Sequence, residues 1–273
     1  MLDTTPPNLN KKYDFIFSIG AACSCTQSLR SLRLQVRSLP FDWLYGCGFV
    51  DRCRLIASDF STWLIKDELE YMGCRTSSSP HRYVYKNKLT GMTFNHDFFS
   101  PLSDESFENV KAKYNRRIDR LMSSIGRSKR VLAVYIDVPT TSAALSDDEL
   151  IEGYNILCSK FPDVVIDILY IHNDDKVPYD ERVVESLNAH IHKQTFCYNA
   201  FCKNLPHTVN SLLLKKALVG IRLSYRNLTL ADILRWHKLK KFIYSSKYQG
   251  NGICEIRILG VRLRKKHRTL TCA

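Results

Sequence analysis

The 273-residue sequence contains no run of about 18 consecutive apolar residues, the length that a transmembrane helix needs. Its polar start, MLDTTPPNLNKK, also lacks the apolar core of a signal peptide. Glycine and proline are scarce, with 11 and 9 residues, while 45% of the residues are hydrophobic, which excludes a low-complexity chain. We therefore expect a cytoplasmic globular protein that buries a sizeable core.

Metal-binding and nucleotide-binding signatures are absent as well. The ten cysteines and eight histidines form no CxxC pair and only isolated close pairs: Cys23 and Cys25, Cys197 and Cys202, and His190 and His192. This spacing predicts no metal site, and the length of the chain favours reduced thiols over a disulfide framework. Because no glycine-rich phosphate loop occurs, we expect no required cofactor.

Positive charge is concentrated near the end of the chain. Residues 203–273 carry 16 lysines and arginines against two acids, Asp232 and Glu255 (16 − 2 = +14), whereas the whole chain carries +13. Such a surface attracts the phosphates of a substrate or of an anionic membrane, or it is a solvated surface that aids solubility. No recognition helix, zinc-finger spacing or RNA-binding aromatic signature accompanies it, which argues against nucleic acid.

The most informative segment surrounds Cys23. Residues 15–17 predict a buried strand, Gly20 allows a turn, and helical spacing predicts a helix from about Ser24. Cys23 then lies at or just before the helix N-terminus, where unpaired N–H groups and the helix dipole favour a reactive thiolate. The alternative is that Cys23 and Cys25 are small buried hydrophobic residues.

Four blocks of the sequence carry a family resemblance: SIGAAC at residues 18–23, SLPFDWL at 38–44, FNHDF at 94–98 and YNRRIDRL at 114–121. Their order resembles the papain-like cysteine peptidase family of bacterial capsule and lipopolysaccharide loci. It is similar, more remotely, to capsule-locus papain-like acetyltransferases. The resemblance implies that Cys23 is the nucleophile and His96 its base, with Asp42 and Asp97 as orienting or structural carboxylates.

The third catalytic member stays open between two carboxylates. If His96 and Asp97 are consecutive strand residues, their side chains point to opposite faces, and Asp97 cannot orient the imidazole. Asp42 is then the rival, although it could equally cap the next segment.

Substrate contacts are expected from two places. The backbone N–H groups of Cys23 and Ser24 are placed to stabilise an oxyanion. Arg116 and Arg117, on the helix after His96, could clamp a substrate carboxylate or phosphate, or they could form a solvated helix face.

Periodicity predicts helices over residues 49–60, 62–70, 104–125, 147–161 and 208–219, a loop at 77–81, and strands over 82–86, 91–94, 131–137, 164–171 and 195–198. His96 would follow the second of these strands. Two apolar strands joined by a helix predict a parallel crossover, buried on both faces. The alternating ending EIRILGVRLRKKHRT predicts a basic hairpin that turns near Gly260.

These elements predict a three-layer α/β fold: a central, mostly parallel or mixed sheet flanked by helices, with a basic C-terminal extension. Residues 1–202 would form the domain with the Cys/His site, and residues 203–273 would pack on it. Cys23 and Asp137 would both lie at the carboxyl edge of the sheet, where ligands bind in such folds.

We therefore expect a thiol-dependent acyl hydrolase or acyltransferase of bacterial surface-polysaccharide biosynthesis. Its partner would be a surface-glycan precursor or another phosphate-bearing substrate, with acyl-coenzyme A as a conceivable donor and peripheral association with the anionic inner membrane face. The alternative is a non-catalytic binding module that recognises a glycan, a lipid phosphate or a protein through its basic C-terminal region.

Overall fold

The computed structural model describes residues 11–76, 80–137, 144–178, 181–197, 217–224, 228–229 and 232, and the backbone of three strands within 244–266. The chain divides into two compact units, Met1–Asn227 and Leu228–Ala273. The division at residue 202 and the packing of residues 203–273 on the first domain stay predictions.

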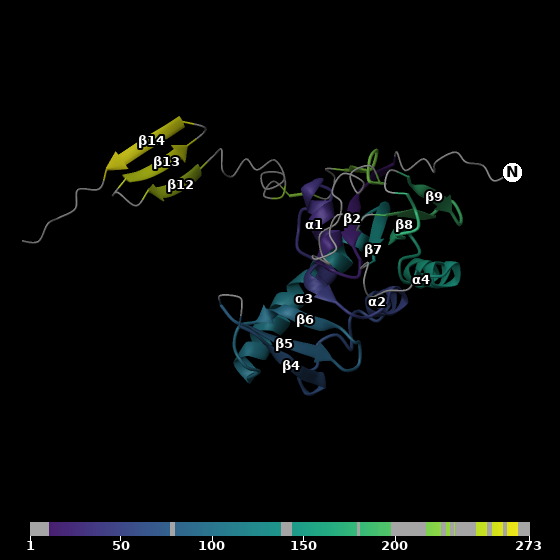
Figure 1. Cartoon of the computed structure of the whole chain (residues 1–273), viewed down its shortest axis with the longest axis horizontal. Coiled ribbons are helices and arrows are strands. Elements are labelled where there is room, and N and C mark those ends of the chain that lie inside the picture. Colours follow the sequence, from purple (N-terminus) through teal and green to yellow (C-terminus); the bar gives the residue numbers. More distant parts are fainter. Residues whose placement is uncertain are drawn as a thin grey trace, which may run out of the picture. The chain divides into compact units, whose positions relative to one another are not determined.

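A five-stranded mixed sheet forms the centre of the first unit (Figure 1). Its strands, in spatial order, are β2 (Phe15–Ser18), β7 (Arg130–Ile136), β8 (Val165–Asn173), β10 (Ile191–Phe196) and β9 (Val183–Ser186). The first four run parallel and β9 is antiparallel to β10. The predicted α/β class and the parallel crossover between β7 and β8 are confirmed, whereas β9 was not predicted.

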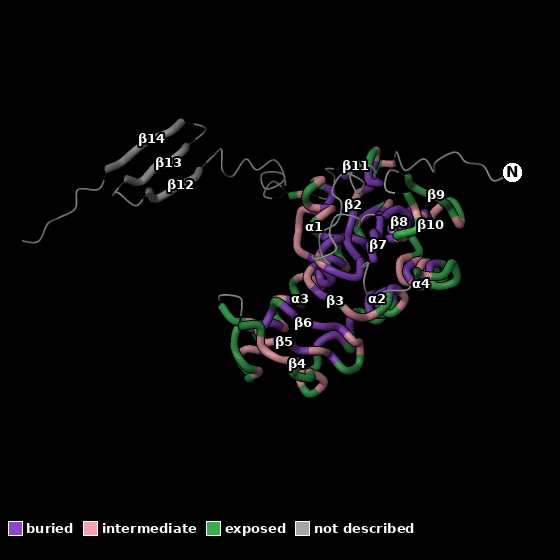
Figure 2. Tube along the Cα trace, viewed as in Figure 1, coloured by how far each residue is buried: buried purple, intermediate pink, exposed green. Residues whose placement is uncertain are grey.

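Both faces of this sheet are buried, as the continuous apolar strands predict. One face belongs to the main core with apolar residues of the helices, and its members on β7 and β8 are Val131, Ala133, Tyr135, Ile166, Ile168 and Tyr170. The residues that alternate with them are fully buried too: Leu132, Val134, Ile136, Leu169 and Ile171. Figure 2 shows this buried core running through β2, β7 and β8.

In the described part of the chain, four helices accompany the sheets: α1 (Cys23–Ser31), α2 (Phe49–Ala57), α3 (Asp104–Gly126) and α4 (Asp147–Lys160). Helix α1 packs on β2 and β7, whereas α4 packs on β8, β10 and α2. Helix α4 begins at the predicted residue 147, after a capping box in which Ser146 and Glu149 bond each other's backbone N–H. Helix α2 ends earlier than the predicted residue 60, because Asp59 and Phe60 adopt positive φ angles.

A second sheet lies between α1 and α3 in the chain. Its order is β3 (Leu44–Tyr45), β6 (Thr93–Phe98), β5 (Arg82–Asn87) and β4 (Leu69–Arg75), and all neighbours are antiparallel. The strands predicted over residues 82–86 and 91–94 are confirmed in part, and they pair with each other as the hairpin β5–β6. His96, however, lies within β6 and not after the strand, because β6 extends to Phe98.

The helix predicted over residues 62–70 is wrong. The segment holds a 3-10 turn, Lys66–Glu68, and the start of β4. The side-chain amide of Asn87 donates to the Trp63 carbonyl at 2.7 Å, and the Lys88 N–H donates to the Glu68 carbonyl at 2.9 Å. These bonds tie the segment to the end of β5, and tertiary pairing therefore overrides its helical spacing.

A short parallel pair, β1 (Lys12–Tyr13) with β11 (Arg222–Leu223), completes the first unit. Most of the predicted helix 208–219, part of the loop at 77–81, and Tyr198 lie outside the described residues. None of the helices in the described part of the chain is long and apolar enough to cross a membrane.

The second unit contains a three-stranded antiparallel sheet of β12 (Tyr244–Gln249), β13 (Ile253–Ile258) and β14 (Val261–Lys266). Strands β13 and β14 pair Ile258 with Val261, which confirms the predicted hairpin. Its turn residue Gly260 lies outside the described residues, and β12 was not predicted.

The buried carboxylate of Asp167 joins β8 to neighbouring strands. It accepts hydrogen bonds from Tyr13 at 2.8 Å, His190 at 2.8 Å and Arg130 at 3.0 Å. Burial raises the pKa of this carboxyl, but these partners and Lys11 outweigh it and hold the pKa below the ordinary 3.8. A lowered native pKa stabilises the fold above the unfolded-state pKa, and this stabilisation is lost as the pH falls below it.

We therefore expect Asp167→Asn to lower the free energy of unfolding at pH 7 by about 1–3 kcal/mol. The variant should also lose less stability than the wild type between about pH 5 and pH 2. Urea unfolding across this range measures both effects. Equal pH slopes for the two proteins would show that Asp167 does not contribute to acid unfolding.

Candidate active site

The nucleophile candidate follows a tightly held loop. Beyond β2 the chain continues beside β7, since Ile19 N–H donates to Val134 O at 2.9 Å and Ala21 N–H to Ile136 O at 3.2 Å. A Cβ atom at Gly20 would lie 2.7 Å from the Cβ of Cys25, and only glycine fits there. Ala22 is the extended N-cap of α1, and Cys23 is the first helical residue, as predicted.

Cys23 is half-buried, and burial raises the pKa of its thiol. The backbone N–H groups of Cys23 and Ser24 act in the opposite direction but do not outweigh burial. The helix N-terminus therefore supports a thiolate without producing an acidic thiol, and a base is needed at neutral pH. Cys25 differs, because its fully buried thiol donates to Val134 O at 3.3 Å and has a pKa raised to about 12.

The side of α1 that carries Cys23 faces the turn formed by Pro40–Trp43 (PFDW). Residues three and seven positions apart share one side of a helix, so Cys23 lies in line with Thr26 and Arg30. The Thr26 hydroxyl donates to Asp42 Oδ1 at 3.0 Å, and the Arg30 guanidinium donates to Asp42 Oδ2 at 3.1 Å. The structure thus brings the Cys23 side of α1 to the PFDW turn.

Asp42 is completely buried and has further donors. The amide of Gln35 donates to Oδ1 at 2.8 Å, and the Leu39 N–H donates to Oδ2 at 2.9 Å. Burial nevertheless raises the pKa of this carboxyl. Each carboxylate oxygen of Asp42 therefore has two donors. This agrees with the alternative in which Asp42 caps a segment of the backbone and does not orient His96. A role in orienting His96 stays a prediction.

His96 comes from the strand beside the PFDW turn. Strand β3 directly follows the turn and pairs Leu44 with Phe94 of β6, which places Asp42 and Trp43 next to the stretch of β6 after Phe94. The β5–β6 register shifts between Phe94 and Phe98, and His96 is exposed at this irregularity. His96 as the base of Cys23 stays a prediction.

Asp97 points to the other side of β6 and is buried. It accepts a hydrogen bond from Lys113 at 2.5 Å and one from the Tyr114 hydroxyl at 3.0 Å, both on α3. The opposite placement of His96 and Asp97 agrees with the strand geometry that the sequence suggested. These contacts give Asp97 a structural role in docking α3.

The two arginine candidates on α3 differ. Arg116 is exposed, whereas Arg117 is half-buried over the Tyr114 ring, 5.1 Å from its centroid. The buried Nη1 of Arg117 has no hydrogen-bond partner among the described residues. Ser24 is buried, so its N–H and not its hydroxyl is the feature relevant to an oxyanion. Substrate contacts of all three stay predictions.

Sequence reasoning missed Arg52, which is completely buried on α2. Its guanidinium donates to four carbonyls: Gly20 at 2.6 Å, Ala21 at 3.5 Å, Gly46 at 2.8 Å and Cys47 at 3.2 Å. No carboxylate pairs with it in the described part of the chain, and burial lowers its pKa. An arginine within an apolar helical pattern was the only signal that the sequence offered.

A second histidine, His172, also escaped notice because the predicted strand ended at residue 171. Its Nδ1 bonds Asp137 Oδ2, which also accepts from the Tyr170 hydroxyl at 3.0 Å. Since a carboxylate only accepts, Nδ1 carries the proton and Nε2 is the basic nitrogen. Asp137 follows β7 as predicted, and the pair lies at the carboxyl edge of the central sheet.

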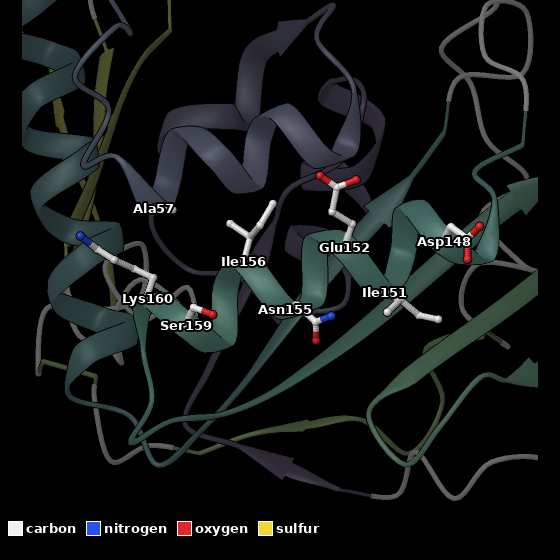
Figure 3. Close-up of a pocket in the computed structure, with 8 residues that line it drawn as sticks. All are labelled: Ala57, Asp148, Ile151, Glu152, Asn155, Ile156, Ser159 and Lys160. Atoms are coloured by element: carbon white, nitrogen blue, oxygen red, sulfur yellow. The ribbon is translucent and has the colours of Figure 1, made fainter.

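One described hollow lies along the outer side of α4 (Figure 3). Its lining residues, among them Ile151, Glu152 and Asn155, include no cysteine or histidine, and it is not a candidate for thiol chemistry. Among the described residues, no group of three or more His, Cys, Asp or Glu side chains is arranged to hold a metal ion. The seven cysteines that the structure describes are free thiols.

Comparison with known sequences identifies a family and a relative. Residues 14–153 match a family model described as "Putative papain-like cysteine peptidase (DUF1796)". The "Uncharacterized protein R408" of Acanthamoeba polyphaga mimivirus is 28% identical over 175 residues, which are 57% of this chain and 76% of that protein. No solved structure matches the chain. Because the family model covers just over half of the 273 residues, including Cys23, the PFDW turn and His96, the chain belongs to the family of putative papain-like cysteine peptidases.

Proposed function

We propose that the protein is a thiol-dependent acyl hydrolase or acyltransferase with Cys23 as its nucleophile. The observation that carries the proposal is the position of Cys23: the first residue of α1, after a parallel strand, on the helix side that faces the PFDW turn. Family membership supports the same residue. The resemblance assigns the base to His96, whose strand runs beside that turn.

The proposed reaction begins with transfer of the Cys23 thiol proton to the imidazole. The sulfur lone pair forms a bond to the acyl carbon while the carbonyl π electrons move to oxygen, and the N–H groups of Cys23 and Ser24 stabilise this oxyanion. The oxyanion then collapses to a thioester, and the leaving group departs with the proton from the imidazolium. Water or a hydroxyl group resolves the thioester by the reverse sequence.

The proposed substrate carries negative charge. Arg117, with a buried N–H that lacks a partner in the described part of the chain, supports recognition of a carboxylate or phosphate. The basic residues of segment 203–273 support the same class. A surface-glycan precursor, with acyl-coenzyme A as donor in the transfer reaction, fits this charge, and an anionic membrane surface would hold such a precursor nearby.

Trapping of an acyl-enzyme tests the function. The protein is mixed with p-nitrophenyl acetate at pH 7 and quenched in acid, and the acetylated peptide is located by mass spectrometry. We expect an acetyl group on Cys23 that hydroxylamine removes, because thioesters react with this nucleophile. A sugar alcohol is then added: hydrolysis yields acetate, whereas transfer yields the acetyl ester of the sugar alcohol.

Two cysteine variants are the controls. Cys23→Ala should form no hydroxylamine-sensitive adduct, and Cys74→Ala, which alters another half-buried free thiol, should behave as the wild type. Acetylation of the wild type at other cysteines only would overturn the proposal. Salt-sensitive binding of anionic vesicles by such an unreactive protein would instead favour the binding module built on the basic segment.

A further inference from the structure

Arg52 combines features that a purely packing residue lacks. Its guanidinium is fully buried without a carboxylate partner in the described part of the chain, and it lies 5.3 Å from the Phe41 ring centroid. A buried charge of this kind costs several kcal/mol unless it makes many hydrogen bonds. Its bonds go to two loops, one of which leads directly into Cys23.

The bond to Gly20 fixes a peptide group near the nucleophile from both sides. The carbonyl of Gly20 accepts from Arg52 at 2.6 Å, and the N–H of the same peptide group, on Ala21, donates to Ile136 O at 3.2 Å. Because a trans peptide group is planar with C=O and N–H on opposite sides, its orientation is set. The next carbonyl, of Ala21, also turns toward Arg52.

The Gly20–Ala21 and Ala21–Ala22 peptide groups directly precede the Ala22–Cys23 group, whose N–H is the first of helix α1. Cys23 follows after Ala22, and the N–H groups of Cys23 and Ser24 lower the thiol pKa against burial. The positive guanidinium also polarises the Gly20–Ala21 and Ala21–Ala22 peptide groups, which directly precede the peptide group that carries the Cys23 N–H. Arg52 therefore acts on the site through the backbone and without reaching the substrate.

We propose that Arg52 is the positioning residue of the Cys23 site, because its buried guanidinium fixes the Gly20 and Ala21 carbonyls and thereby aims the first N–H groups of α1 at the sulfur and the acyl oxygen. The effect on the acyl oxygen rests on the proposed function, whereas the effect on the Cys23 sulfur does not. Gly46 and Cys47, whose positive φ angles are 82° and 64°, are held by the same guanidinium.

Arg52→Lys tests the proposal, because a single ammonium group keeps the charge but cannot bond all four carbonyls. We expect a folded protein in which Cys23 is acetylated about 10–100-fold more slowly. Removal of one oxyanion donor slows a reaction by roughly 10²–10³-fold, and in this variant the donors are displaced but still present. The pH profile of iodoacetamide alkylation at Cys23 should move to higher pH. The profile of Cys74 in the same protein should not move.

Arg54→Lys is the matched control, since Arg54 lies on the same helix but is exposed and bonds Asp51 and Glu152. It should leave both Cys23 readouts unchanged. A folded Arg52→Lys protein with wild-type acetylation and alkylation profiles would overturn the proposal. If the wild type forms no thioester but the alkylation profile still shifts, the proposed function fails and the positioning role stands.

Amide hydrogen exchange of the wild type keeps the proposal testable if Arg52→Lys does not fold. The Ala21 N–H should be as protected as the amides of β7, because its peptide group is held on both sides. Fast exchange at Ala21 would show that Arg52 does not fix this peptide, whatever the variants do.

Discussion

Replacing His96 by glutamine is expected to slow acetylation of Cys23 by about 10²–10⁴-fold, the usual contribution of a general base. The reason is the raised pKa of the half-buried Cys23 thiol, which leaves little thiolate at neutral pH without a proton acceptor. The exposed position of His96 makes the substitution mild for folding. The measurement is the rate of thioester formation from pH 5 to pH 10.

The pH profile distinguishes a catalytic role from a structural one. In His96→Gln the remaining rate should rise with pH up to the titration of the thiol itself, because hydroxide then replaces the imidazole. Thermal unfolding should remain close to that of the wild type.

His172→Gln is the informative control. His172 bonds Asp137 at the carboxyl edge of the same sheet that leads into Cys23, and its imidazole is therefore the alternative candidate for a base. We expect its replacement to leave the acetylation rate within about twofold of the wild type. If His172→Gln abolishes acetylation and His96→Gln does not, the base is His172 and the role implied by the resemblance is wrong.

The elements that the sequence predicted well are those in which local pattern and burial agree. The apolar strands 131–137 and 164–171 lie in the sheet centre, where both faces are buried, and their continuous hydrophobic character is sufficient evidence. The start of α1 near Cys23 could be predicted because Gly20 indicates a turn directly after an apolar strand, and the structure shows that only glycine fits beside Cys25. The position of the nucleophile candidate therefore follows from local chemistry.

The contacts around the candidate site could not be predicted because they join distant segments. Arg52 bonds the carbonyls of Gly20 and Ala21, which lie 32 and 31 residues earlier in the chain. Asp42 accepts hydrogen bonds from α1 and from the N–H of Leu39 before its own turn. Strand β4 was missed because none of its seven residues is buried, and only pairing with β5 defines it. Single-sequence periodicity contains no information on such partners.

Asp42→Ala is expected to lower the free energy of unfolding by about 3–5 kcal/mol, the usual cost of removing one partner of a buried charged network. Alanine leaves Thr26, Gln35, Arg30 and the Leu39 N–H without their acceptor in the protein interior. For a chain of this size the melting temperature should fall by roughly 6–20 °C. Thermal and urea unfolding measure the change.

Asp51→Ala is the control for this loss, since Asp51 is an exposed carboxylate that bonds Arg54 on the surface of α2. Its effect should stay below about 1 kcal/mol.

The comparison also decides between the two roles left open for Asp42. If Asp42 orients His96, its replacement should change the pH profile of acetylation in the folded protein. If Asp42 instead ties α1 to the PFDW turn, stability should fall while the profile of the remaining folded protein keeps its wild-type shape. The saturation of both carboxylate oxygens by protein donors leads us to expect the second result.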